Sequence, residues 1–539
     1  KTKIHGVEVF PEDIFLDSKN IPEFDTQQFE GRIEQPISKK TVRSLGVLFV
    51  AIALVFLGKL VILQLVRGEA YVKRSEANSY DSEPLFAERG VIYDRNGVEL
   101  AWNTLAPGDS VPHRVYKAGG FGQLLGYVSY PKRDSSGYFW QLAYEGKAGV
   151  EKLYQETLEG ENGATLARRN VSGEIESENS VVAPVSGENV TLAIDARLQE
   201  KMYESIKTLA DTAGYDGGAG IVLDIKTGEI ISLVSYPEYD ATILSEGKEK
   251  DIIRAYARDH RKVYLNRAVS GLYTPGSIVK PFLALAALNE HIISPEKQIL
   301  STGSISLTSP YDPDVVSTYK DNKAHGWVDM RHALAVSSNV YFYTIGGGYG
   351  DQQGLGIGRI ETYTKMFGLD SLTGVNIQGE KKGNIPSPSW KEEKFNGDIW
   401  RIGDTYNTSI GQYGFQVTPV AMARAIAAIA NGGTMVTPSI TPGIPTETFP
   451  TISFAQSDLD VVREGMRMVV TDGSGQLFKY LPFSVAAKTG TAQVGLQKRF
   501  VNAWMVGFFP YEEPRYSFVF LMEHGPGGEA VVGASRAAL

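Results

Sequence analysis

The sequence contains no cysteine among its 539 residues, which excludes disulfides, thiolate zinc sites and cysteine nucleophiles. An excess of basic residues is also missing, and the net charge of −9 argues against nucleic-acid binding. The seven histidines show neither metal-ligand spacing nor a triad partner beside a Gly-x-Ser-x-Gly elbow. No Gly-x-x-x-x-Gly-Lys-Ser/Thr phosphate loop occurs either. The length favours more than one domain.

One long apolar run, Leu45–Val66, is interrupted only by Lys59 and Gln64. Because about twenty apolar residues suffice to cross a bilayer, we predict a transmembrane helix over residues 44–66, with a buried core helix as the alternative. A cleaved signal peptide fits poorly, since no small-x-small site follows the run. The polar residues 1–43 predict a mostly disordered tail. Basic residues flank both ends of the run and leave its orientation open.

Residues 67–209 alternate short elements without a large apolar core, which predicts an extended, β-rich module. Two strands joined at Asn96-Gly97 are expected within residues 89–101, since this dipeptide is a strong hairpin turn. We also expect a strand over 124–129, a short helix over Val150–Leu158, a strand over 189–193, and Asp195 as the N-cap of a helix over Ala196–Leu209.

From about Gly217 the pattern is that of an α+β domain whose sheet takes strands from both ends of the domain. Strands are predicted over 219–224 and 229–234. Helices are predicted over 277–290, 329–346, 358–367, 418–431 and 457–471. Further strands are predicted over 483–487, 491–494, 501–508 and 515–522.

A candidate nucleophile lies in the stretch Thr274–Phe282, just before the apolar run Leu283–Leu288. Pro and Gly ahead of that run place Ser277 near a helix N-terminus, and Lys280 falls one turn later on the same face. A serine needs a neighbouring base, and a buried lysine with a lowered pKa can supply it. The spacing alone leaves catalysis and a turn serine equally open, because it recurs in polar surroundings at Ser129/Lys132, Ser245/Lys248, Ser294/Lys297 and Ser317/Lys320.

Two further motifs follow in order. Ser337-Ser338-Asn339 comes roughly 60 residues after Ser277, and Lys488-Thr489-Gly490-Thr491 comes roughly 150 residues later in a predicted strand. Ser-x-x-Lys, Ser-x-Asn and Lys-Thr-Gly in this order are the signature of penicillin-binding proteins and serine β-lactamases.

The whole chain resembles the class B penicillin-binding proteins of the elongation-specific type. Other stretches that carry the resemblance are Arg89-Gly90, Asp94–Gly97, Asn266-Arg267-Ala268, Asn384-Ile385-Pro386, Trp390, Gly403–Gln412 and Thr418-Pro419. The resemblance implies a transpeptidase domain with an antiparallel sheet flanked by helices. It also implies a β-rich pedestal, so that we divide the chain into a tail (1–43), a transmembrane helix (44–66), a pedestal (67–209) and a transpeptidase domain (210–539).

The resemblance implies a peptidoglycan D,D-transpeptidase that works through a serine acyl-enzyme and is sensitive to penicillin. Ser277 would attack the D-Ala-D-Ala stem peptide after neutral Lys280 takes its proton. Ser337 would pass the proton to the leaving amine, and Lys488 would supply a positive charge that keeps Lys280 neutral.

The same resemblance implies how substrate is held. Asn339 would bind the substrate amide, and Thr489, Gly490 and Thr491 would line the site of the terminal carboxylate. The backbone N–H groups of Ser277 and Thr491 would form the oxyanion hole.

The resemblance further implies a bacterial cytoplasmic-membrane protein with a cytoplasmic N-terminus and an extracytoplasmic catalytic domain. The implied partners are peptidoglycan stem peptides, β-lactams, a polytopic glycosyltransferase of the shape, elongation, division and sporulation family, and an elongation scaffold protein. The chain looks monofunctional. Septal cross-linking, a β-lactamase or β-lactam sensor, and a non-catalytic activator of the glycosyltransferase are the alternatives.

The sequence departs from the family in several places. Residues 103–114 replace a longer head subdomain, Gly411-Gln412-Tyr413-Gly414 stands for the usual Gly-Gln-Gly, and the chain stops at Leu539, where the family continues a C-terminal helix. Some members bind zinc near the Ser-x-Asn helix. Asp312, Asp314 and His325 lie in that stretch, but no cysteine can complete such a site, so we expect no metal and no cofactor.

Overall fold

The computed structural model describes residues 39–69, 80–107, 109–135, 138–169, 175–309, 312–443, 449–495, 499–526 and 533–538. The chain divides into two compact units, residues 1–82 with 166–179 and residues 83–165 with 180–539. The polar tail predicted for residues 1–43 lies outside the described residues up to residue 38.

The first unit contains one long apolar helix. Helix α1 (Lys39–Val61) continues into the short π-helical segment η2 (Ile62–Val66). Residues 42–66 are long and apolar enough to cross a membrane, and none of them is buried in the protein. A soluble amphipathic helix would bury one apolar face, so these exposed side chains fit the predicted membrane span.

The second unit begins with a small sheet that contains the predicted hairpin. Gly97 has a φ of +82°, which suits glycine in a tight turn, and Asp94 Oδ1 accepts hydrogen bonds from the backbone N–H of Asn96 and Val98 at 2.7 and 2.8 Å. Thr104 pairs directly with His113 across the short connection. The strands, in spatial order, are β11 (Val190–Thr191), β2 (Ile92–Tyr93), β3 (Glu99–Thr104) and β4 (His113–Tyr116).

The strand predicted over 124–129 is wrong. Residues 122–125 form the short helix α3 (Gly122–Leu125), and only β5 (Val128–Ser129) is a strand. Gly126, at a φ of +76°, ends the helix where the chain passes against Ala148 O, so that a Cβ would have no room. Because Leu124, Leu125 and Val128 are all fully buried, their pattern could not distinguish helix from strand.

Other small elements complete this part of the chain. They are β6 (Lys132–Arg133), β7 (Phe139–Gln141), β8 (Glu145–Gly146), α4 (Gly149–Leu153) and α5 (Gln155–Glu159). A sheet of β1 (Tyr80–Leu85), β9 (Gly163–Arg169) and β10 (Ile175–Val182) has residues in both units.

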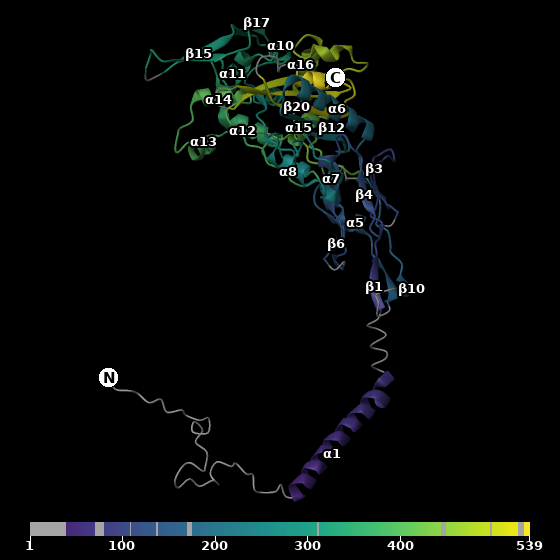
Figure 1. The fold of residues 1–539 in the computed structure, drawn as a ribbon. Coiled ribbons are helices and arrows are strands. Elements are labelled where there is room, and N and C mark those ends of the chain that lie inside the picture. Colours follow the sequence, from purple (N-terminus) through teal and green to yellow (C-terminus); the bar gives the residue numbers. More distant parts are fainter. Residues whose placement is uncertain are drawn as a thin grey trace, which may run out of the picture. The chain divides into compact units, whose positions relative to one another are not determined.

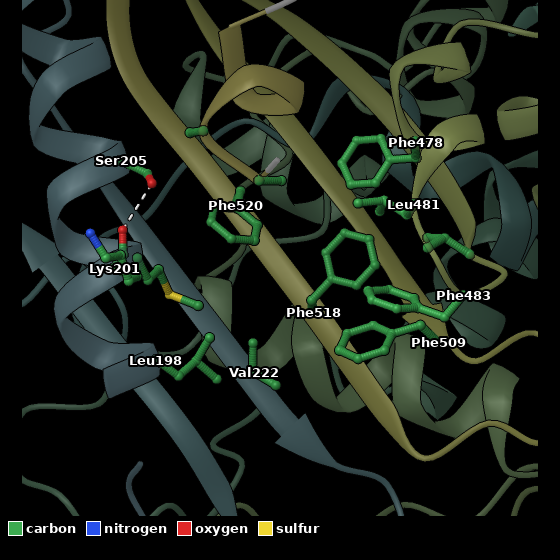
Figure 2. Close-up of a pocket in the computed structure, with 14 residues that line it drawn as sticks. Leu198, Lys201, Ser205, Val222, Phe478, Leu481, Phe483, Phe509, Phe518 and Phe520 are labelled. Carbon is green, nitrogen blue, oxygen red and sulfur yellow. Dashed lines mark hydrogen bonds between the residues drawn. The ribbon is translucent and has the colours of Figure 1, made fainter. Parts of the chain in front are cut away.

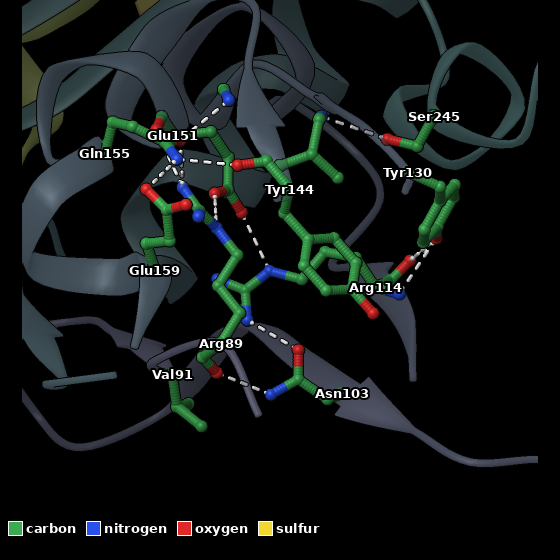
Figure 3. A network of polar contacts seen from close by, with 12 residues as sticks. Arg89, Val91, Asn103, Arg114, Tyr130, Tyr144, Glu151, Gln155, Glu159 and Ser245 are labelled. Carbon is green, nitrogen blue, oxygen red and sulfur yellow. Dashed lines mark hydrogen bonds and ion pairs between the residues drawn. The ribbon is translucent and has the colours of Figure 1, made fainter. Parts of the chain in front are cut away.

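Arg89, Arg114 and Glu151 form a buried ion triad that connects the segment before β2, strand β4 and helix α4 (Figure 3). Glu151 on α4 accepts hydrogen bonds from Arg89 Nε at 2.6 Å and from Arg114 Nε at 2.7 Å. Arg89 also donates to Gln155 Oε1, and Arg114 donates to Asn103 Oδ1. All three charged side chains are at most 1% exposed, so Glu151 links three segments far apart in the sequence.

The larger part of the second unit is built on one antiparallel sheet. Its strands, in spatial order, are β13 (Ile230–Tyr236), β12 (Gly217–Asp224), β20 (Tyr516–Pro526), β19 (Phe500–Phe509) and β18 (Ala486–Val494). The pairing of β12 with β20 confirms that strands from both ends of the domain meet in one sheet. The two strands predicted over 483–487 and 491–494 are one, because Lys488-Thr489-Gly490 stays paired with β19.

Helices cover both faces of this sheet (Figure 1). Helix α6 (Ala196–Ala213) packs on one face, and Asp195 is its N-cap as predicted, accepting from Arg197 N and Leu198 N. The other face carries α15 (Pro419–Ala430), while α9 (Lys280–Asn289) lies in the core, buried on every side up to Leu288. The predicted helix over 329–346 is two helices, α10 (Met330–Val336) and α11 (Asn339–Gly347).

The remaining elements surround this core. They are α7 (Ala241–Glu246), α8 (Lys250–Arg258), η3 (Gly276–Val279), β14 (Ile299–Ser301), β15 (Ser304–Thr308), β16 (Val316–Lys320), β17 (Gly326–Val328), α12 (Gly356–Met366), α13 (Pro388–Lys394), α14 (Ile402–Ser409), α16 (Gln456–Thr471), η5 (Gln476–Tyr480) and α17 (Gly533–Ala538).

An apolar cavity of about 230 Å³ lies between α6 and the sheet (Figure 2). Met202, Phe478, Phe509, Phe518 and Phe520 are among the side chains that line it. None of the predicted site residues lines this cavity, so it is separate from the chemistry inferred from the sequence.

Candidate active site

Ser277 lies in a tight turn that is pressed against strand β18. It belongs to the 3₁₀ turn η3, which leads directly into α9, so the predicted helix-opening position is confirmed. Gly490 on β18 has room only for hydrogen, because a Cβ there would lie 2.9 Å from Pro275 O and 2.8 Å from Ile278 Cγ2. Gly276 N donates to Gly411 O at 3.0 Å from the other side. The close contact at Gly490 therefore brings the Lys-Thr-Gly strand onto the serine turn.

Lys280 is fully buried, and its ammonium group points at the Ser-x-Asn motif. Nζ donates to Ser337 O and to Asn339 Oδ1 at 2.7 Å each, and to Ser337 Oγ at 3.2 Å. Among the hydrogen bonds of the described residues, none joins Lys280 Nζ to Ser277 Oγ. Burial lowers the pKa of Lys280 to about 7, and the carboxylate of Asp321 partly opposes that shift. A substantial neutral fraction, which a base requires, therefore exists near neutral pH.

Ser337 sits at the break between α10 and α11. Its φ of +60° is uncommon for a residue other than glycine, and such backbone strain is often found at functional sites. The break also frees Ser338, whose hydroxyl caps α11 by accepting from Tyr341 N at 3.3 Å. The strained turn thus directs Ser337 and Asn339 toward Lys280.

Lys488 approaches the same hydroxyl from the sheet. Its Nζ donates to Ser337 Oγ at 2.8 Å and to Thr489 O at 3.0 Å, and the side chain is fully buried. Burial, and then the charge of Lys280, hold the pKa of Lys488 well below its usual value. Two ammonium groups on one hydroxyl titrate as a coupled pair, in which charging one disfavours charging the other. Burial therefore favours the neutral form of Lys488, whereas the sequence led us to expect a fixed positive charge there.

The threonines of the third motif differ in exposure. Thr489 is buried, and its Oγ1 lies 2.6 Å from the Oγ of Ser474, a residue in the loop just after α16. Thr491 is partly exposed on the edge strand β18, and its carbonyl lies close to Gly276. The structure thus brings Ser277, Lys280, Ser337, Asn339 and the 488–491 strand together, and it adds Ser474 and Asp321, which sequence patterns did not indicate.

The three residues considered for zinc do not form a cluster. Asp312 and Asp314 are exposed in the turn between β15 and β16, while His325 Nε2 lies 2.7 Å from Asn322 Oδ1. Within the described part of the chain, no group of three or more His, Cys, Asp or Glu side chains is placed to hold a metal.

Comparison with known families identifies the fold and its chemistry. The family described as the penicillin binding protein transpeptidase domain matches residues 218–539, which span every motif of the site. The chain belongs to the penicillin-binding protein transpeptidase family. The penicillin-binding protein dimerisation domain matches residues 109–192, within the predicted pedestal.

Several curated relatives carry the name peptidoglycan D,D-transpeptidase MrdA. The protein from Escherichia coli K12 is 27% identical over 604 residues, covering 92% of each chain. The protein from Haemophilus influenzae is 30% identical over 413 residues, which cover 71% of this chain and 60% of that protein.

Solved structures show the same likeness. PBP2 of Pseudomonas aeruginosa, in complex with WCK 5153, has a TM-score of 0.67 and 28% identity, covering 84% of this chain and 96% of that one. PBP2 of Helicobacter pylori, in complex with MreC, has a TM-score of 0.67 and 25% identity, covering 85% and 98%. These comparisons confirm the predicted fold class, family and serine D,D-transpeptidase activity, and they favour the elongation type over the septal alternative.

Proposed function

We propose that this chain cross-links peptidoglycan stem peptides during cell elongation, with Ser277 as the nucleophile. The observation that carries the proposal is the meeting of two fully buried lysines on one serine hydroxyl beside the Ser277 turn, with Nζ–Oγ distances of 3.2 Å from Lys280 and 2.8 Å from Lys488. Buried lysines without a carboxylate bonded to Nζ are costly for stability, so their placement favours a catalytic role.

Acylation begins when neutral Lys280 takes the proton of Ser277 and Oγ attacks the penultimate carbonyl of a D-Ala-D-Ala stem peptide. The oxyanion is stabilised by the N–H groups of Ser277 and Thr491, and such donors typically contribute about 3–4 kcal/mol each. As the C–N bond breaks, Ser337 passes a proton to the leaving D-alanine and takes one from protonated Lys280, which becomes neutral again. An amine of a neighbouring stem peptide then attacks the ester and gives a proton to Lys280, and the C–O bond breaks as that proton returns to Ser277 Oγ.

The terminal carboxylate of the bound substrate would supply a negative charge that stabilises a proton on Lys488. Asn339 would hold the substrate amide, and the terminal carboxylate would lie beside Lys488, Gly490 and the hydroxyls of Thr489 and Thr491. A carboxylate beside Lys488 raises the pKa of that amine, because an opposite charge favours the ammonium form. A proton on Lys488 then disfavours one on Lys280, so the bound substrate helps to generate its own base.

The chain is further proposed to be anchored in the bacterial cytoplasmic membrane, with a cytoplasmic N-terminus. This extends the division into a tail (1–43), a transmembrane helix (44–66), a pedestal (67–209) and an extracytoplasmic transpeptidase domain (210–539). A polytopic glycosyltransferase of the shape, elongation, division and sporulation family and an elongation scaffold are the proposed partners. Support comes from the apolar helix over residues 42–66 and from the PBP2–MreC complex of the Helicobacter pylori relative.

Labelling with a fluorescent penicillin tests the nucleophile, because a β-lactam acylates the same oxygen. We expect Ser277→Ala to abolish labelling. Ser294→Ala is the matched control, since Ser294 and Lys297 share the Ser-x-x-Lys spacing but Ser294 is exposed after α9. Ser294→Ala should label like the unchanged chain, and labelling that persists in Ser277→Ala would refute the assignment.

A further inference from the structure

A buried carboxylate supports the Ser337–Asn339 turn from behind. Asp321 follows β16, and its side chain is 0% exposed. Its Oδ2 accepts hydrogen bonds from Ser338 Oγ at 2.8 Å, Val340 N at 2.9 Å and Ser301 Oγ at 3.2 Å. One atom therefore connects β14 with the first turn of α11.

Asp321 also carries the carboxylate that acts on the catalytic lysine. Burial would raise the pKa of Asp321, but hydrogen bonds from the N–H groups of Asn339 and Val340 and from the Ser338 hydroxyl, with the charge of Lys280, hold it below its usual value. The group is therefore ionised at neutral pH. Its charge favours the ammonium form of Lys280, whereas burial and the charge of Lys280 both lower the pKa of Lys488.

The other ionisable neighbour of Asp321 does not replace this charge. His325 Nε2 lies 3.7 Å from Asp321 Oδ1, and its side chain is 2% exposed. Burial lowers the pKa of His325, as do the charges of Lys323 and Lys280, although Asp321 opposes them. The imidazole is thus neutral at neutral pH and does not neutralise Asp321. The negative charge of Asp321 therefore still raises the pKa of Lys280.

We propose that Asp321 is a positioning residue for acylation, an inference that rests on the proposed function. Its hydrogen bonds hold the Ser337–Asn339 turn in place. Its charge keeps the proton on Lys280 rather than on Lys488 while no substrate is bound. Before substrate binds, the base is held partly protonated. The carboxylate of the stem peptide beside Lys488 then offsets the bias of Asp321 and moves the proton, so that attack by Ser277 is coupled to correct binding.

Two substitutions separate the charge from the hydrogen bonds. Asp321→Asn keeps the size and one acceptor oxygen but removes the charge, whereas Ser338→Ala keeps the charge and removes one hydrogen bond to it. Asp321→Glu restores the charge with displaced geometry. Asp314→Asn, an exposed change of the same charge on the neighbouring turn, is the matched control.

The test measures the second-order rate of acylation by a fluorescent penicillin from pH 5 to 9, with a melting curve for each variant. We expect Asp321→Asn to move the acid-side half-maximum down by about one pH unit, because the charge of Asp321 raises the pKa of Lys280 and an opposite charge typically shifts a pKa by about one unit or more. Ser338→Ala should lower the plateau rate without moving the half-maximum. Asp321→Glu should return the half-maximum to that of the unchanged chain, and Asp314→Asn should match it throughout.

An unchanged half-maximum in Asp321→Asn, with only a uniform fall in rate, would overturn the proposal and leave Asp321 a purely structural residue. If Asp321→Asn does not fold, Asp321→Ser carries the same test, because a hydroxyl is also uncharged and fits among Ser301 and Ser338. Failure of the proposed function gives a different result, since labelling would then persist in Ser277→Ala.

Discussion

Removal of the Glu151 carboxylate should destabilise the pedestal far more than any surface change. In the unchanged chain, Glu151 is the one acidic partner of Arg89 and Arg114 among the described residues, at 2.6 and 2.7 Å. Arg89 Nη1 and Arg114 Nη2 have no hydrogen-bond partner in the described part of the chain. Glu151→Ala therefore leaves two buried guanidinium groups without a counter-charge (Figure 3).

The expected cost follows from that geometry. Breaking a buried ion pair by removing one partner costs about 3–5 kcal/mol, because the remaining charge is left uncompensated. For a region of this size, such a loss lowers the midpoint of thermal unfolding by about 10 °C. Scanning calorimetry measures the midpoint, and hydrogen exchange of β2, β3 and β4 shows whether the loss is local to the pedestal.

The matched control is Glu156→Ala, which removes the same charge from an exposed position on the adjacent helix α5. We expect that variant to melt within about 1 °C of the unchanged chain, as surface substitutions usually do. If Glu151→Ala and Glu156→Ala melt together, with equal exchange in β2–β4, the triad does not hold the pedestal and the reasoning is refuted.

Two further predictions concern the active site. The acylation rate of the unchanged chain should rise with pH through about 7, because the neutral form of Lys280 is the base and its pKa is lowered to about 7. For a single base the rate at pH 6 is then about one eleventh of the plateau; a rate independent of pH between 5.5 and 8 would contradict this. Gly490→Ala should slow acylation about a hundredfold, because its Cβ would force η3 away from β18 and a displacement of about 1 Å has that effect. Gly358→Ala, where a Cβ meets nothing within 4 Å, is its control; equal acylation rates in the two variants would show that the contact does not position Ser277.

The chain order of the three motifs predicted the site, and at the first and third of them local sequence determines the backbone. Pro275 and Gly276 begin the turn before an apolar helix, and the small residues around Gly490 suit a strand that another segment approaches closely. The hairpin at Asn96-Gly97 was predictable for the same local reason. These features depend on a few adjacent residues.

The remaining features depend on contacts between distant segments. Asp321 lies in a polar stretch whose composition is typical of a solvated turn, and its hydrogen bonds with the distant Ser301 and Ser338 appear only in the folded chain. The break at Ser337 was missed because the apolar pattern continues across it from α10 into α11. The strand predicted over residues 124–129 is wrong because a short, mostly buried apolar run has no clear helical or strand period.

Peptide mapping of the penicillin adduct by mass spectrometry tests the central claim most directly. The chain is incubated with penicillin, digested, and the added mass is located along the sequence. The account predicts a single penicilloyl group on the peptide that contains Ser277, and on Ser277 within it when the peptide is fragmented. An adduct located on any other residue would contradict the account.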